Sequence, residues 1–273
     1  MAKDQTKQTV FAIVNLVNTE DQMRNTITYA ADLAKHKKCD LILHPKHEES
    51  PYSFPQATEV ISKLADTMGF AHTLSQQAPS FFTSIHRIAE KQQAVSIVIG
   101  VSEKITKKVS KQEFSDTMWD VANRSHIPIY LVPKKAKFDP ASEITIAVDA
   151  NRTIQKAAFL NGFTTKDTIV HLFIESTTDP IRQKRINWTN EKIAAYLSRH
   201  DISFVPTIAR EEHNYSQHLM KFAAKKSKLL IIEVASTLDS DLKEHLQRVL
   251  FGKHQEFAVL LLRTEDYTLT TYR

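Results

Sequence analysis

The feature that most constrains this chain is an alternation of short apolar runs with longer amphipathic stretches. The runs are rich in β-branched residues, as in buried strands, and the stretches between them show helical spacing. The first half contains five such runs, at residues 9–16, 39–45, 70–75, 94–100 and 127–133. Helical patterns separate them near residues 20–38, 55–69, 79–93 and 112–125. This order is typical of a parallel sheet covered by helices.

The second half repeats the order. Its predicted strands cover residues 143–149, 167–175, 202–209, 228–235 and 256–263. Its predicted helices lie near residues 151–161, 181–199, 213–226 and 239–251. When the halves are aligned, Asn15 falls on Asp149, and Gly100 falls on Glu233. The near-constant offset indicates a tandem duplication.

We therefore predict an α/β fold made of two doubly wound domains, residues 1–135 and 141–273. Each domain is expected to hold a five-stranded, mostly parallel sheet with four helices. The charged segment 134–142 is the predicted linker. Asn18 or Thr19 is expected to cap the first helix, and Gly69 to end the second.

Composition indicates a globular protein, with 42% hydrophobic and 25% charged residues in 273. The N-terminus lacks the apolar core of a signal peptide, and no run is long enough to span a membrane. We therefore expect a cytoplasmic protein with no membrane partner. Cys39 is the only cysteine, which excludes an intrachain disulfide and a multi-cysteine metal site.

The net charge of +5 is spread along the chain. Residues 1–140 carry 18 Lys and Arg against 15 Asp and Glu, and the rest carries 18 against 16. Such an even excess does not concentrate positive potential as a nucleic-acid groove does, so we expect no nucleic-acid partner.

Doubly wound sheets bind ligands beyond the carboxyl ends of their strands, so the residues that follow each strand are the candidate site. Asn15 and Leu16 end the first strand, and Asp149 and Asn151 occupy the equivalent place in the second half. Their amide and carboxylate groups could hydrogen-bond a nucleoside. The alternative is that these short polar side chains only cap the following helix.

The fourth strand of the first half ends at Gly100, where backbone can approach a ligand closely. Val101 offers the next N–H group, and Lys104 begins a series of lysines at helical spacing. These groups could hold a phosphate, although the charge of Glu103 opposes it. Alternatively, the lysines form a solvated helix face.

His44, at the end of the second predicted strand, is also a candidate ligand-binding residue. Two histidine motifs do not point to a metal or a catalytic site. His44 and His47 form a His-x-x-His pair, but Pro45 prevents a helical register and no third ligand has suitable spacing, so we predict no metal site. His171 lies between apolar residues and is expected to be a hydrogen-bonded core histidine. No glycine-rich loop or nucleophile motif occurs, so we predict no catalytic residue and no enzymatic activity.

Three stretches resemble the universal stress protein family in its tandem two-domain form, which has an adenine nucleotide alpha hydrolase-like fold. They are "SIVIG", "DTMWDVANRSHIPIYLVP" and "IAVDANRTIQKAA". Members that bind ATP carry Gly-x-x-Gly, about nine residues, then Gly-Ser/Thr. In this chain the first glycine is Gly100, the second position is Glu103, and the closing pair falls on Ser115 and Asp116. The second half has Glu233 and Ser236 at the glycine positions.

The resemblance implies a non-catalytic regulatory or binding module of the stress response, with weak or no ATP binding and no cofactor. The alternative is an AMP- or ATP-binding switch at the strand ends of the first domain. Because the family commonly dimerises through its last strands, residues 127–133 and 256–263 are expected to pair. The resemblance thus implies an internal pseudo-dimer or a homodimer, with a small molecule as a candidate ligand.

Overall fold

The computed structural model describes residues 8–46, 50–76, 81–101, 121–122, 124–150, 157, 159–160, 163–209, 215–234, 244, 246–247, 250–251 and 256–263. The strands of the first half are β1 (Thr9–Asn15), β2 (Asp40–Lys46), β3 (Thr73–Leu74), β4 (Ala94–Gly100) and β5 (Ile129–Val132). Its helices are α1 (Glu20–Lys37), α2 (Phe54–Thr67) and α3 (Phe81–Lys91).

The strands of the second half are β6 (Ile144–Val148), β7 (Ile169–Ile174), β8 (Ser203–Ile208), β9 (Leu229–Val234) and β10 (Ala258–Arg263). Its helices are α6 (Pro180–Arg199) and α7 (Tyr215–Lys226). All ten predicted strands form, although the third pairs over two residues only. The helices predicted near 112–125, 151–161 and 239–251 lie mostly outside the described residues.

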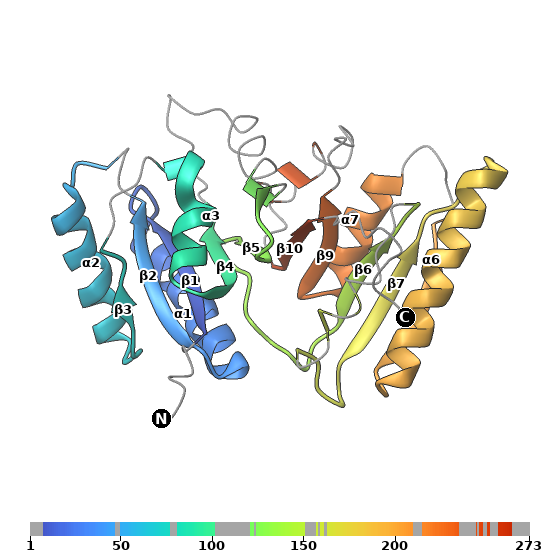
Figure 1. Ribbon diagram of the computed structural model, residues 1–273, viewed down its shortest axis with the longest axis horizontal. Helices are drawn as coiled ribbons and strands as arrows, with labels where there is room; N and C mark the ends of the chain where they lie inside the picture. The colour runs from blue at the N-terminus through green and yellow to red at the C-terminus, as the bar shows by residue number, and fades with distance from the viewer. Residues whose placement is uncertain are drawn as a thin grey trace.

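The ten strands form one continuous sheet in the order β3-β2-β1-β4-β5-β10-β9-β6-β7-β8. Each half contributes a parallel five-stranded part, and β5 joins β10 in an antiparallel pair through Ile129, Tyr130 and Leu131. Figure 1 shows this pair at the centre, with α2 and α6 at opposite ends of the molecule. The predicted α/β class, with a large and mostly parallel sheet, is confirmed.

Helix boundaries follow the predicted signals. Thr19 caps α1 and forms a capping box with Gln22, which satisfies two backbone donors at the helix start. Lys38, with a φ of 56°, ends α1. Gly69 follows α2 with a φ of 74°, where the absence of a Cβ avoids strain. The predictions for Thr19 and Gly69 are thus confirmed.

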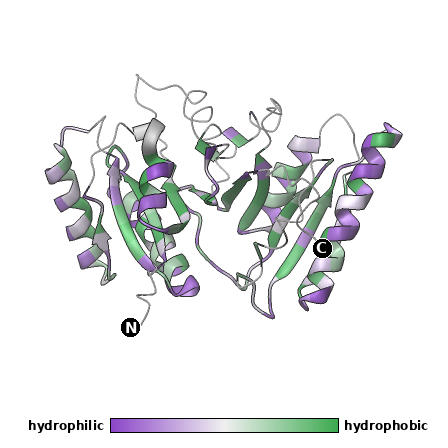
Figure 2. Ribbon diagram, in the orientation of Figure 1, coloured by the Kyte–Doolittle hydropathy of each residue, from purple (hydrophilic) through white to green (hydrophobic). Residues whose placement is uncertain are grey.

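Apolar side chains cover both faces of the sheet, because alternate strand residues point to opposite sides. In β1, Val10 and Ala12 pack on the side of α1, α2 and α6, whereas Phe11 and Ile13 pack on the side of α3 and α7. Figure 2 shows strands that are mostly hydrophobic and helices on which hydrophilic and hydrophobic stretches alternate. Each core contains residues of both halves, so the halves share their hydrophobic interior.

The predicted linker packs against both halves. The Asn25 amide of α1 donates hydrogen bonds to the carbonyl oxygens of Pro133 and Ala136, both at 3.0 Å. The Phe138 ring makes edge contacts with Tyr29 of α1 and Phe163 of the second half, with centroids 5.6 and 5.7 Å apart. The linker therefore fixes the second half against α1.

We predict that Phe138→Ala lowers the free energy of unfolding by about 2–4 kcal/mol, because it removes a partly buried ring that contacts both halves. Urea denaturation followed by circular dichroism measures the change. Tyr52→Ala, at a ring that is 42% exposed, is the matched control and should change stability by less than about 0.5 kcal/mol. Equal effects of the two substitutions would contradict the role given to Phe138.

Candidate functional site

The carboxyl ends of the first-half strands carry an unusual group of buried polar side chains, which we call the first-half edge. Asn15 ends β1, His44 and Lys46 lie at the end of β2, and Ser75 follows β3. All four are less than 8% exposed. Buried lysine is rare in proteins, so this edge differs from an ordinary solvated strand end.

Asn15 and Leu16 serve the local backbone. The Asn15 Oδ1 atom accepts a hydrogen bond from the Val17 N–H at 3.2 Å, and its carbonyl accepts one from the Asn18 N–H at 3.1 Å. The Leu16 N–H donates to the carbonyl of Lys46 at 3.0 Å. The hydrogen bonds of Asn15 thus belong to the turn between β1 and α1, and the Leu16 bond continues the pairing of β1 with β2. The helix itself is capped by Thr19 and not by Asn15.

Gly100 is required by helix packing. A Cβ at this position would overlap Thr26 Oγ1 of α1 and would lie 3.1 Å from Thr26 Cγ2. Thr26 is itself buried, with its hydroxyl donating to the Gln22 carbonyl at 3.0 Å. The Val101 N–H donates to the Val132 carbonyl at 2.9 Å, so this donor belongs to the sheet. Neither residue presents the geometry expected of a phosphate loop.

Six residues named for the two proposed sites lie outside the described residues. They are Glu103, Lys104, Ser115 and Asp116 of the first half and Asn151 and Ser236 of the second half.

His44 is held by aromatic packing. Its ring is 1% exposed, stacks on Phe11 at a centroid distance of 5.5 Å and lies 6.0 Å from Phe54. Its sequence neighbour His47 is outside the described residues. In the part of the chain that the structure describes, no three His, Cys, Asp or Glu side chains are grouped as metal ligands.

Two other residues behave as their sequence context indicates. His171 is buried, and its Nε2 atom lies 2.6 Å from Oε2 of the partly exposed Glu143, which confirms it as a buried, hydrogen-bonded histidine. Cys39 precedes β2 at the opposite edge of the sheet, and its thiol donates to the Lys37 carbonyl at 3.4 Å. Burial raises the pKa of the Cys39 thiol, so the reactive thiolate is a smaller fraction at neutral pH than for an exposed cysteine.

Asn18, in the turn that follows β1, adds to this edge a side chain whose polar atoms have no partner. It is 7% exposed, and neither its Nδ2 nor its Oδ1 atom has a hydrogen-bond partner in the protein. The Ser75 hydroxyl is also buried without a partner. Each such group costs about 1–3 kcal/mol of stability, and natural proteins keep few of them away from functional sites. Asn18 therefore marks this edge as a candidate binding site.

The second-half edge is occupied by contacts within the protein. The Tyr215 hydroxyl of α7 donates to the Phe173 carbonyl of β7 at 3.0 Å, across the strand ends. Arg182 of α6 forms an ion pair with the buried Glu175 at 2.7 Å. Asp149 is half-buried at the end of β6. No unpartnered amide comparable to Asn18 lies at this edge among the residues described.

Sheet register supports the alignment of the two halves. Ile13 of β1 pairs with Ile99, one residue before Gly100. In the second half Ile146 pairs with Ile231, so the same register brings Ala147, the counterpart of Ile13, level with the residue before Glu233. Both positions face the α1 side of the sheet. Glu233 is 3% exposed, so a buried carboxylate stands where the first half has a glycine.

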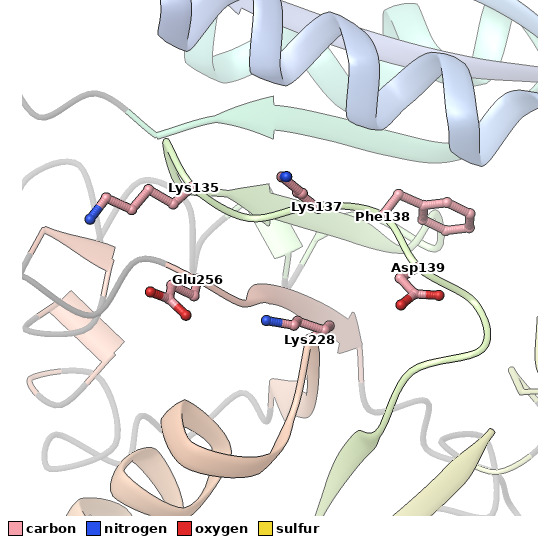
Figure 3. Close-up of a pocket in the computed structure, with 6 residues that line it drawn as sticks. All are labelled: Lys135, Lys137, Phe138, Asp139, Lys228 and Glu256. Carbon is pink, nitrogen blue, oxygen red and sulfur yellow. The ribbon is translucent and has the colours of Figure 1, made fainter. Parts of the chain in front are cut away.

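A surface hollow lies away from both edges, between the linker and the starts of β9 and β10 (Figure 3). Its volume is about 530 Å³. It is lined by Lys135, Lys137, Phe138, Asp139, Lys228 and Glu256. Its charged side chains are all exposed and of both signs, so it lacks the buried polar group that distinguishes the first-half edge.

Sequence reasoning missed several residues that shape these edges. Lys46 and Ser75 follow strands directly, so the rule that selected Asn15 could have found them. Tyr215 begins a helix and Arg182 lies in one, and no local pattern links either residue to a strand end.

Comparison with known proteins identifies the fold. No model of a known protein family matches the sequence, and no curated protein matches it either. Among solved structures, a universal stress protein from Archaeoglobus fulgidus DSM 4304 superposes with a TM-score of 0.59 at 12% identity, over 93% of this chain and 98% of that one. This chain therefore has a universal-stress-protein-like fold at the length of a tandem form.

Two structures from Pseudomonas aeruginosa agree. A putative universal stress protein from strain UCBPP-PA14 has a TM-score of 0.57 at 12% identity, over 95% of this chain and 94% of that one. A functionally unknown protein from strain PAO1 has a TM-score of 0.58 at 13% identity, over 96% and 94%. Within the described residues, no helix is long and apolar enough to cross a membrane.

We predict that Gly100→Ala lowers the free energy of unfolding by about 1–3 kcal/mol, because the new methyl group overlaps Thr26. Thr26→Ala in the same chain should recover at least half of this loss. A double-mutant cycle from urea denaturation measures the coupling. Additive effects of the two substitutions would refute a packing role for this glycine.

Proposed function

We propose that this chain is a non-catalytic, tandem universal-stress-like module of the stress response that binds a small molecule at the first-half edge. The observation that carries the proposal is Asn18, a buried amide without a partner, at the edge where doubly wound sheets bind ligands. The solved structures support the fold-level part of the proposal. The ligand is one that offers both a hydrogen-bond donor and an acceptor, because the amide supplies one of each.

We further propose that its affinity for ATP is weak or absent. Close packing against Thr26 explains why residue 100 is a glycine, and the Val101 N–H donates to the Val132 carbonyl of the sheet. The retained glycine therefore does not support a phosphate loop. In the second half, Glu233 places a carboxylate at the glycine position. Losing charge-assisted backbone donors worth about 1.5–3 kcal/mol each weakens binding by orders of magnitude.

A second candidate is an AMP- or ATP-binding switch at the same edge. It is favoured by Lys46, a buried lysine at the end of β2, because a cation at the strand ends suits a phosphate ester. This candidate needs donors from residues between β4 and β5, whereas the leading proposal does not.

We also propose that the protein is a cytoplasmic internal pseudo-dimer without a nucleic-acid partner. The β5–β10 pairing supports the pseudo-dimer, because these are the two strands that the family resemblance implies should pair. In this arrangement β5 and β10 hydrogen-bond each other within one chain, so neither strand needs a second copy of the chain to pair its backbone groups.

Isothermal titration calorimetry of the purified full chain with ATP should give a dissociation constant above about 1 mM, equivalent to a binding free energy weaker than about −4 kcal/mol. AMP should behave in the same way. A low-micromolar constant for either nucleotide would reject the leading proposal in favour of the switch.

Asn18→Leu should leave the free energy of unfolding unchanged or raise it by about 1 kcal/mol, because it removes an unpartnered polar group while keeping a similar volume. Thermal denaturation measures the change. Asn25→Leu is the matched control and should lower stability by about 1–3 kcal/mol, since its amide donates two hydrogen bonds to the linker.

Native mass spectrometry of the same proteins tests the binding role. A small molecule retained by the wild type and by Thr26→Ala, but lost from Asn18→Leu, is the expected result. If Asn18→Leu is strongly destabilising, or if it retains the same ligand as the wild type, the assignment of this edge fails.

A further inference from the structure

Large apolar side chains are exposed mainly at one end of the sheet. Of the six large hydrophobic residues that are exposed in the described chain, five belong to β7, α6 and β8, the outer elements of the second half. Ile181 of α6 is 71% exposed, Trp188 of α6 is 44% exposed and Ile208 of β8 is 66% exposed. Among the side chains that the structure describes, Tyr52 is the one large hydrophobic residue exposed at the opposite end of the sheet.

Ile181, Trp188 and Ile208 lie on the side of the sheet that α6 covers. Ile186, Ile193 and Leu197 define the inward face of α6. Ile181 and Trp188 are two turns apart and face away from it, because a helix repeats after seven residues. Phe204 of β8 packs into the core on the α6 side, and strand alternation puts Ile208 on that side too.

Basic side chains surround Trp188 on the helix surface. Lys184, Arg185 and Lys192 lie four, three and four residues from it, so they are its neighbours on the helix. The Lys192 ammonium lies 5.7 Å from the Trp188 ring centroid. Over residues 180–199 there are five Lys and Arg and one acidic residue, Glu191. Figure 2 shows α6 at the margin of the molecule, largely hydrophilic along its visible face.

We propose that this surface, formed by Ile181, Lys184, Arg185, Trp188, Lys192 and Ile208, binds peripherally to an anionic lipid bilayer. Tryptophan favours the membrane interface, and exposed isoleucines gain from contact with acyl chains. Lysine and arginine near the surface are attracted by anionic headgroups. The combination of aliphatic, indole and cationic groups on one face fits a lipid surface better than a nucleic acid, which offers no apolar phase to Ile181 and Ile208.

A second copy of the chain fits this surface poorly. Two copies related by a two-fold axis would bring the basic α6 faces together, and like charges repel. Pairing through the β8 edge is also opposed. The Ala209 N–H donates to Ile174 of β7, so alternation directs the backbone of Pro206 to the free edge, where it offers no N–H.

The sequence-based expectation of no membrane partner rested on the absence of a spanning segment. Peripheral binding through α6 needs none, and the helix stays packed on the sheet through its inward face. The proposal is independent of the small-molecule site, because the two surfaces belong to different halves.

Co-sedimentation of the full chain with vesicles tests the proposal. We expect binding to phosphatidylcholine vesicles that contain about 30% phosphatidylserine, with at least a fivefold lower bound fraction on pure phosphatidylcholine. Raising the salt from about 0.05 to 0.5 M should lower binding at least fivefold, because screening weakens the attraction. No binding at low salt, or equal binding to both vesicles, overturns the proposal, as does capture of an acidic protein without any vesicle binding.

Variants locate the surface. Lys184→Glu with Arg185→Glu should lower the bound fraction at least tenfold, and Trp188→Ala at least threefold. Lys225→Glu with Lys226→Glu, the same charge change at exposed residues of α7, should stay within twofold of the wild type. Circular dichroism checks that each variant is folded. If the α7 variant loses binding as fully as the α6 variant, general charge rather than this surface is responsible, and the proposal fails.

Discussion

The antiparallel pairing of β5 with β10 is the interaction on which the rest of the structure depends. Without it, each half would present an apolar edge strand to solvent. With it, ten strands form one sheet, and both apolar cores run across the junction. The linker reinforces the arrangement through Phe138, which contacts residues of both halves. Two copies of one topology thereby become a single structural unit.

Within this unit the two strand-end regions have different chemistry. The second half fills its edge with the Tyr215 hydroxyl and the ion pair between Glu175 and Arg182. The first half keeps the amide of Asn18 buried and unpartnered. A polar group in that state is unfavourable for the isolated protein, so its presence is understandable if an external molecule completes its hydrogen bonds. The same fold thus carries contacts within the protein at the strand ends of one half and an unpartnered buried amide at those of the other.

Much of the fold could be predicted from the sequence, because strands buried on both faces read as continuous apolar runs. The exception is β3, whose predicted run of six residues pairs with β2 over only two, whereas the other edge strand, β8, pairs with β7 over six. The site was less predictable. The packing of Thr26 against Gly100 joins a helix to a strand far away in sequence, and so do the contacts of Tyr215. A lone glycine after a strand looks the same whether a ligand or a side chain lies above it.

The place of β10 as the last of the described strands has a consequence for synthesis. Its partner β5 leaves the ribosome more than a hundred residues earlier, which at roughly 5–20 residues per second is on the order of ten seconds. During that interval β5 is the unpaired edge of the first half, with Tyr130 and Leu131 available to any strand nearby. The growing chain is then open to pairing with a neighbouring nascent copy, and it loses this vulnerability only when residues 258–263 dock.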